Sequence, residues 1–213
     1  MKTIRILLWV LLTLPLYGQI ERIGTIPGCI CTDIVVLETD HLLVSCKEGV
    51  VFDWTPAGRD TLIHLDVETD GESGLLGLTR ISNKLYLQYV DHNFDQHIVS
   101  VDSLTIDTLL SVHTLTNFPN HRGGDLDTDG THLYASIGEG LGDDGYVLIL
   151  DTLGNILSEA HGLRNPWKIH VSGEDIWITD VGDQDREEIN LVPIEDLDEI
   201  HFNWPCFEGT VQL

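Results

Sequence analysis

The chain has 213 residues, 42% of them apolar, and is long enough to bury a hydrophobic core in one domain. Eleven basic residues stand against 35 acidic ones, and the formal net charge is −24. A surface this acidic repels phosphate backbones, so nucleic acid is excluded as the expected partner. So many carboxylates indicate either a solvated surface or groups that collect a hard cation such as calcium.

The N-terminus has the pattern of a secretory signal. A short positive region precedes an apolar run at Ile6–Leu16, and a small residue follows at Gly18. This run is too short to span a membrane as a helix, and no other stretch is apolar enough to do so. We therefore expect residues 1–18 to be a signal peptide and residues 19–213 to form the fold. The protein is expected to be secreted or periplasmic, with no stable membrane span.

Four cysteines follow, at Cys29, Cys31, Cys46 and Cys206. Export favours disulfides over free thiols. Cys46 can be bridged by Cys31 or by Cys29, and the sequence does not choose between them. A metal site is not favoured, because the chain has no second closely spaced cysteine pair.

No segment after the signal has helical periodicity of useful length. Short apolar or alternating runs recur instead, rich in Val, Ile, Leu and Tyr, and turn residues separate them. Strands are predicted at Asp33–Leu37, Leu42–Ser45, Val50–Trp54, Thr61–Leu65, Leu75–Thr79, Lys84–Val90, His97–Val101, Asp107–Val112, Leu133–Ile137, Tyr146–Asp151, Lys168–Val171, Asp175–Thr179 and Glu188–Val192. Many short strands at near-regular spacing indicate a sandwich, a barrel or a propeller.

An internal repeat favours the propeller. Similar hydrophobic triplets recur at Leu42–Val44, Leu85–Leu87, Leu133–Ala135 and Ile176–Ile178. Their spacing of about 45 residues suits one four-stranded blade per repeat. The sequence therefore predicts an all-β propeller with about four blades and with functional residues on the loops of one face. No closing strand is evident near the last residues, so we expect the chain to be the front part of a longer propeller.

Three loops carry residue types that a redox or binding site needs. Gly162–Trp167 places a guanidinium at a turn, and Asn120–Gly124 places an imidazole beside two glycines. Gly182–Asn190 is a short loop rich in carboxylate and amide oxygens. A cation suits an anionic ligand, an imidazole can act as a base, and oxygens suit a hard metal ion.

Eight runs stand in the order in which one known family carries them. They are Gly71–Leu78, Leu85–Tyr89, Asn120–Gly124, Leu133–Gly140, Gly162–Trp167, Ile176–Gly182, Arg186–Asn190 and Asn203–Gly209. From about Ile26 onward the chain resembles the glucose/sorbosone dehydrogenase family. That family includes soluble quinoprotein glucose dehydrogenase, the aldose sugar dehydrogenases and the propeller of hedgehog-interacting protein. The resemblance implies a six-bladed propeller, of which this chain is the N-terminal two-thirds or less.

The resemblance also implies a chemistry. A pyrroloquinoline quinone (PQQ) on the propeller axis, assisted by calcium, would take a hydride from an aldose and pass electrons to an acceptor, leaving the lactone. His121 stands at the position of the general base, a role that suits an imidazole. Arg164 stands where the family's arginine contacts the quinone oxygens, with Asn165 beside it. The competing interpretations are a surface histidine and a structural turn arginine.

Further residues of this chain correspond to site positions of the family, some with a different residue type. The carbonyls of Gly182 and Asp183 correspond to those that hold the cofactor's calcium, and Glu188 corresponds to a structural calcium ligand or is a strand-edge charge. Glu72 and Glu139 lie in the substrate region, where the glucose dehydrogenase pattern has a glutamine and an aspartate. Three tryptophans are expected to pack within blades rather than against a sugar: Trp167, Trp177 and Trp204.

Three departures from the family's pattern support an alternative. Asp183 stands where the glucose dehydrogenase pattern has a proline, which places the sequence nearer the hedgehog-interacting type, where quinone oxidation is not implied. The loop between Gly142 and Tyr146 is short, and the family's cofactor-clamping lysine belongs to later blades. The alternative is a non-enzymatic, secreted propeller that uses calcium and its acidic face to bind a protein or a glycan.

Overall fold

The structure is a computed structural model that describes residues 24–103, 105–113, 119–142, 144–183, 186–208 and 211–212. The expected signal peptide lies outside the described residues, as do Gln184 and Asp185 of the acidic loop. Within the described ranges, no helix has the length and apolar character needed to cross a membrane.

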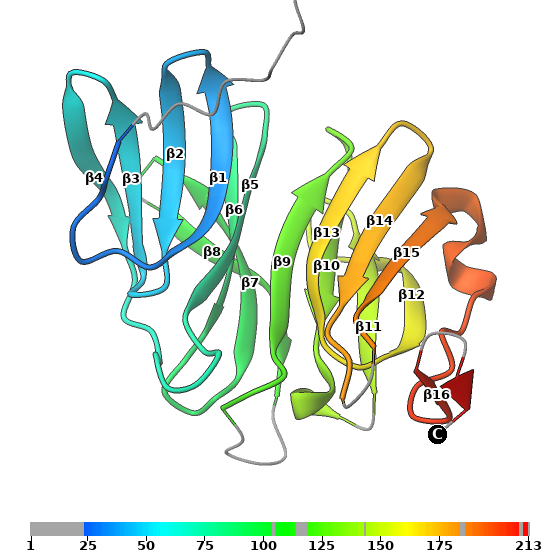
Figure 1. Cartoon of the computed structure of the whole chain (residues 1–213). Helices are drawn as coiled ribbons and strands as arrows, with labels where there is room; N and C mark the ends of the chain where they lie inside the picture. The colour runs from blue at the N-terminus through cyan, green and yellow to red at the C-terminus, as the bar shows by residue number, and fades with distance from the viewer. Residues whose placement is uncertain are drawn as a thin grey trace, which may run out of the picture.

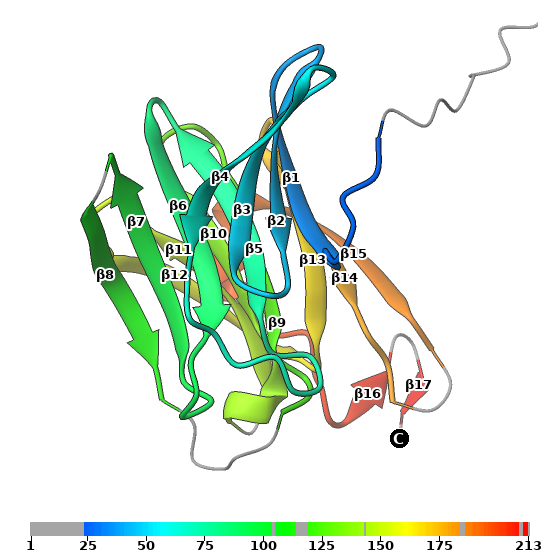
Figure 2. The same cartoon turned by 90° about the vertical axis from the view of Figure 1, so that its left-hand side faces the viewer.

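The chain folds as an all-β propeller, as predicted, with its blades in chain order (Figures 1 and 2). The first blade holds β1 (Cys31–Glu38), β2 (His41–Cys46), β3 (Val50–Thr55) and β4 (Gly58–His64). The second holds β5 (Leu75–Ile81), β6 (Lys84–Val90), β7 (Gln96–Asp102) and β8 (Thr105–Val112). The third holds β9 (Gly123–Thr128), β10 (Leu133–Ile137), β11 (Gly145–Leu150) and β12 (Ile156–Leu163).

The fourth sheet has three strands among the described residues, β13 (Pro166–Ser172), β14 (Asp175–Asp180) and β15 (Glu188–Pro193). A separate hairpin joins β16 (Phe207–Glu208) to β17 (Val211–Gln212). In the part of the chain that the structure describes, the helical segments are two short 3₁₀ helices, η1 (Glu139–Leu141) and η2 (Ile194–Glu199).

The internal repeat identified the blades correctly, because its four copies are the second strands β2, β6, β10 and β14. In β6, Leu85 and Leu87 pack toward the first blade, whereas Tyr86 packs toward the third. A strand turns alternate side chains to opposite faces, so a strand buried on both faces reads as a continuous apolar run. The hydrophobic core is therefore divided into layers between successive blades.

Four strands were not predicted, namely β9 and β12 of the third blade and the two strands of the β16–β17 hairpin. β9 reads Gly-Gly-Asp-Leu-Asp-Thr, which has low strand propensity. Its composition follows from its place as an inner strand, where neighbouring blades approach closely. A Cβ on Gly77 of β5 would lie 2.8 Å from the Gly124 carbonyl oxygen, and a Cβ on Gly123 would lie 2.9 Å from the Pro166 carbonyl oxygen of the fourth blade. Glycine fits these positions because it has no Cβ. Strand propensity scales do not include such close contacts between blades.

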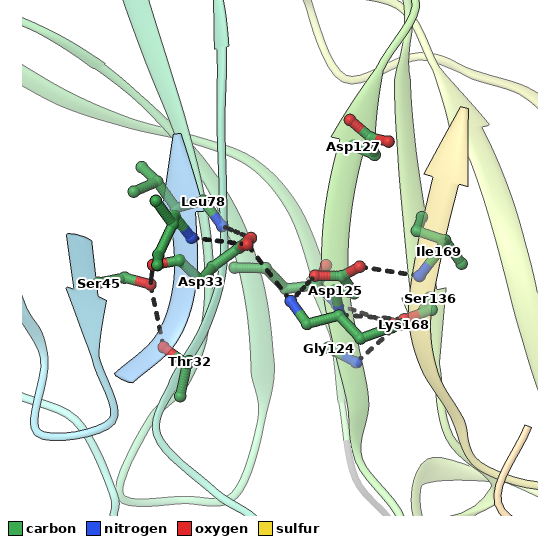
Figure 3. A network of polar contacts seen from close by, with 12 residues as sticks. Thr32, Asp33, Ser45, Leu78, Gly124, Asp125, Asp127, Ser136, Lys168 and Ile169 are labelled. Carbon is green, nitrogen blue, oxygen red and sulfur yellow. Dashed lines mark hydrogen bonds and ion pairs between the residues drawn. The ribbon is translucent and has the colours of Figure 1, made fainter. Parts of the chain in front are cut away.

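Carboxylates on the inner strands bind the backbone of the next blade. Asp33 Oδ2 accepts a hydrogen bond from the Leu78 N–H at 3.0 Å, and Asp125 Oδ2 accepts one from the Ile169 N–H at 2.8 Å. Lys168 Nζ lies 2.5 Å from Asp125 Oδ1 and 3.3 Å from Asp33 Oδ1, as Figure 3 shows. This one ammonium therefore joins the first blade to the third and fourth.

The charges of this axial network depend on one another. Burial raises the pKa of Asp125 to about 6, Lys168 opposes the shift, and Asp33 adds to it. Burial lowers the pKa of Lys168, but the two carboxylates outweigh it and raise that pKa overall. The lysine thus stays charged and compensates carboxylates that would be costly to bury unpaired.

The structure decides between the two candidate disulfides. Cys29 is bonded to Cys46, with their Cα atoms 5.2 Å apart. Cys31 is the backbone partner of Cys46 in the β1–β2 ladder, yet its thiol is free and exposed, like that of Cys206. A disulfide is compatible with the expected extracellular or periplasmic location.

Replacing Asp125 with alanine should lower the free energy of unfolding by about 3 kcal/mol, because the Ile169 N–H and Lys168 both lose a buried partner. Asp127→Ala is the matched control on the same strand. Its more exposed carboxylate accepts the Val171 N–H at 2.8 Å, so a loss of about 1 kcal/mol is expected. Urea unfolding measures both variants, and equal losses would contradict the special role of the axial network.

Candidate functional site

The predicted site residues converge at one end of the inner strands, the lower end in Figure 1. His121 precedes β9, Arg164 lies between β12 and β13, and Glu72 precedes β5. Glu139 begins η1, directly after β10. The loops of three blades therefore bring together residues that lie up to 92 positions apart in the chain, since Glu72 and Arg164 are numbered 164 − 72 = 92 apart.

His121 is held at both its backbone and its ring. Its N–H donates to Glu72 Oε2 at 2.6 Å, and its φ of 54° is a left-handed conformation that few side chains adopt. Ring Nδ1 lies 2.8 Å from Glu139 Oε1, and Nε2 lies 3.2 Å from Arg164 Nη2. Because a guanidinium can only donate, Nε2 accepts the hydrogen bond from Arg164. Nδ1 therefore carries the ring proton and donates a hydrogen bond to Glu139. The imidazole is therefore neutral with its lone pair on Nε2.

The Arg164 guanidinium is 10% exposed and is surrounded by acceptors. Its Nη1 donates to the carbonyl oxygens of Val181 at 3.0 Å and Gly182 at 2.8 Å. Its Nη2 lies 3.3 Å from Asp183 Oδ1, and its Nε lies 3.5 Å from Glu139 Oε1. The arginine thus links the loop after β14 to the histidine and carboxylate of the third blade.

The expectation that the three tryptophans pack within blades was wrong. Trp167 is 38% exposed and Trp177 is 43% exposed. Trp204 lies over the site instead: its Nε1–H donates to Glu139 Oε2 at 2.6 Å, and its ring centroid is 5.5 Å from Arg164 Cζ. An indole combines a flat apolar ring with one donor, so it can cover a cation and bind a carboxylate together.

Glu72 and Asn165 tie the loops of this end to one another. Glu72 Oε2 also accepts from Asn165 Nδ2 at 3.2 Å and from the Arg122 N–H at 3.3 Å. Asn165 Oδ1 accepts the Gly123 N–H at 2.8 Å, and the residue is 1% exposed. In this arrangement the Asn165 amide joins the loops of two blades.

Two further residues of the site were given no role from the sequence. Asp180, 6% exposed, accepts the N–H of Arg164 at 2.9 Å and the N–H of Asn165 at 2.7 Å. Burial raises its pKa to about 6, these hydrogen bonds oppose the shift, and Glu188, its partner in the β14–β15 ladder, adds to it. Arg122 is fully buried and donates from Nη1 to the Phe94 carbonyl oxygen at 3.0 Å.

A cavity of about 270 Å³ opens on the axis beside these residues. Its lining includes Glu72, Lys47, Gly123, Gly124 and Trp167. Asp125 and Lys168 line both this cavity and a second one of about 430 Å³ farther along the axis, so the ion pair lies between the two. Of the predicted site residues, Glu72 faces the first cavity, and it also contacts His121.

The residues predicted to bind calcium are used differently. The Gly182 carbonyl oxygen and the Asp183 carboxylate face the Arg164 guanidinium, and Glu188 lies at the start of β15 opposite Asp180. Over the ranges that the structure describes, no group of three or more His, Cys, Asp or Glu residues is placed to hold a metal ion. A dication at the Gly182 oxygen would lie against a guanidinium, so this donor arrangement does not fit calcium.

No family model matches the sequence, and no curated protein matches it. Among solved structures, a provisionally named oxidoreductase (glucose dehydrogenase) from Thermus thermophilus matches with a TM-score of 0.65 and 21% identity, over 75% of this chain and 61% of that one. The computationally designed Ika4 protein matches with a TM-score of 0.51 and 12% identity, over 82% of this chain and 99% of that one. At these low identities the structural likeness shows a shared fold alone, and the match spans 61% of the length of the Thermus protein.

Asp180 makes the stability of the site depend on pH. Its folded pKa of about 6 lies above the ordinary value of 3.8, so its contribution is fully present below 3.8 and is lost as the pH rises through 6. Relative to Asp180→Asn, the free energy of unfolding of the wild type should therefore fall by about 3 kcal/mol between about pH 4 and pH 7. Urea unfolding of both proteins across this range measures the difference, and a pH-independent difference would refute the assignment.

Proposed function

We propose that this chain is part of a glucose/sorbosone dehydrogenase-type propeller that oxidises an aldose to its lactone, with PQQ as hydride acceptor. The observation that carries the proposal is the Glu139–His121 pair, with the imidazole lone pair on Nε2 next to Arg164. Glu72, which accepts the His121 N–H, connects this pair to the lining of the axial cavity. The fold shared with the Thermus protein supports it, since that protein's name includes glucose dehydrogenase.

His121 acts as the base in this proposal. The proton of the anomeric hydroxyl passes to Nε2 as the carbon–hydrogen bond breaks and the carbonyl of the lactone forms. Glu139, 2.8 Å from Nδ1, stabilises the imidazolium and keeps the ring in the productive tautomer. Because Arg164 donates to the same Nε2 in this structure, the guanidinium must give up that contact when a hydroxyl binds.

The cavity offers groups that suit an anionic, planar cofactor. Lys47 and Lys168 lie in its lining together with Glu72 and Asp125, and Gly123 and Gly124 would let a flat ring approach the backbone. Bound there, PQQ would supply a quinone able to accept the hydride. Arg164 would stabilise negative charge near the reaction centre, as the resemblance implies.

Calcium enters the proposal only as a ligand to be tested, and no step depends on it. In the observed arrangement, binding through Gly182 and Asp183 requires Arg164 to release both. The expected sugar and electron acceptor likewise remain proposals for the complete protein.

The test is dye-linked oxidation of aldoses by the full-length protein in the presence of PQQ and calcium. His121→Ala should lower kcat by roughly 10²-fold or more, because general-base catalysis contributes that much. His113→Ala is the control, since its side chain is 75% exposed and its Nδ1 faces Asp95 rather than Glu139. Undiminished turnover by His121→Ala, or no oxidation of any aldose by the wild type, would rule out this function.

The second candidate is a secreted binding propeller without an enzymatic role. The contacts of Arg164 with Gly182 and Asp183 favour this binding role. The guanidinium lies against the two residues that, according to the resemblance, would hold the calcium of the cofactor. Titration with PQQ, followed by quinone absorbance and by Tm, separates the two. A saturable rise in Tm favours the quinoprotein, since a ligand of the folded state stabilises it. Calcium-dependent capture of a protein or glycan without quinone uptake favours the binding role.

A further inference from the structure

A short segment crosses the candidate site after η2. We call His201–Phe207 the strap. In Figure 1 the chain descends from η2 to the end of the blades where η1 also lies. There it meets the end of β12: the Phe202 N–H donates to the His161 carbonyl oxygen at 2.9 Å, and the Trp204 N–H donates to the Gly162 carbonyl oxygen at 2.8 Å.

The strap covers two central residues of the site. The indole N–H of Trp204 donates a hydrogen bond to Glu139 Oε2, and the indole ring lies against the Arg164 guanidinium. Partly as a result, the Glu139 side chain is 20% exposed and that of Arg164 is 10% exposed. A ligand that contacts the outer face of either group meets Trp204 first.

The strap is held more firmly at its start than along the rest of its length. Phe202 packs against the core cluster between the third and fourth blades. Asn203, Pro205, Cys206 and Phe207 are exposed, which leaves Trp204 as the half-buried residue of this part. Segments with few buried contacts open locally at a low free-energy cost. The part beyond Phe202 can therefore swing while the blade stays folded.

We propose that the strap is a lid on the candidate site. It is closed in this structure, and lifting Trp204 uncovers Glu139 and Arg164 together. The inference concerns access to these two groups and holds whether the site oxidises a sugar or binds another ligand.

Gly162 provides a way to lift the strap. Its φ is +90°, and a Cβ added there would lie 2.5 Å from the His201 ring and 2.7 Å from the Asn203 nitrogen. A methyl group at this position thus pushes directly on the strap. Gly130 is the matched control, because its φ is +89° and a Cβ added there meets nothing within 4 Å.

The experiment compares Gly162→Ala and Gly130→Ala with the wild type in the full chain. Each protein is treated with phenylglyoxal, which modifies accessible guanidinium groups, and the labelled arginines are identified by mass spectrometry. Arg164 should react roughly tenfold faster in Gly162→Ala, and at the wild-type rate in Gly130→Ala. Arg122 is fully buried, so its labelling reports unfolding. Unchanged labelling of Arg164 in Gly162→Ala, or an equal rise in Gly130→Ala, would overturn the proposal.

A second variant decides the matter if Gly162→Ala unfolds and Arg122 becomes labelled. His201→Ala removes the ring whose Nδ1 accepts the Asn203 N–H at 3.0 Å, and its side chain is 58% exposed, so the fold should tolerate the change. Labelling of Arg164 should again rise while Arg122 stays protected. An Arg164 rate equal to that of the wild type would refute the lid.

Discussion

A lysine between two carboxylates joins three blades at the propeller axis. Lys168 belongs to the fourth blade and reaches Asp125 of the third and Asp33 of the first. The carboxylates in turn bind backbone N–H groups of the following blades, so one cluster sets the spacing of inner strands that share no hydrogen-bond ladder. Removing the lysine would leave these buried carboxylates without an opposite charge to offset their desolvation. The candidate site depends on this arrangement because its loops begin or end on the same strands.

Carboxylates also accept hydrogen bonds from backbone N–H groups within the site. Asp180 accepts two backbone N–H groups at the turn that carries Arg164, and Glu72 accepts from the backbone of His121 and Arg122. In a chain with a net charge of −24, several acidic residues therefore serve as internal acceptors and not only as a solvated surface. This use of carboxylates has a cost that depends on pH, since burial raises the pKa of Asp125 and Asp180.

The site combines a fixed tautomer with restricted access. The guanidinium of Arg164 and the carboxylate of Glu139 assign opposite roles to the two nitrogens of His121, which prepares Nε2 to receive a proton. Trp204 lies across the same guanidinium and carboxylate, so the group that covers the site also helps to orient it. The side chains of Arg164 and Glu139 therefore both orient the His121 ring and bind the residue that covers the site.

The sequence by itself determined the class of fold, because alternation of apolar residues and turn chemistry are local properties. The triplets at Leu85–Leu87 and Ile176–Ile178 marked blade centres for this reason. Its resemblance to a known family also grouped His121, Arg164, Glu139 and Glu72 in one site. In the structure His121 contacts the other three, and Arg164 lies against Glu139. Only the tertiary structure decided which oxygens these groups face. The partners of Gly182, the choice of Cys29 over Cys31, the strand at Gly123–Thr128 and the exposure of Trp177 all depend on contacts between distant segments. Such contacts arise from blade packing, and no local pattern of residues encodes them.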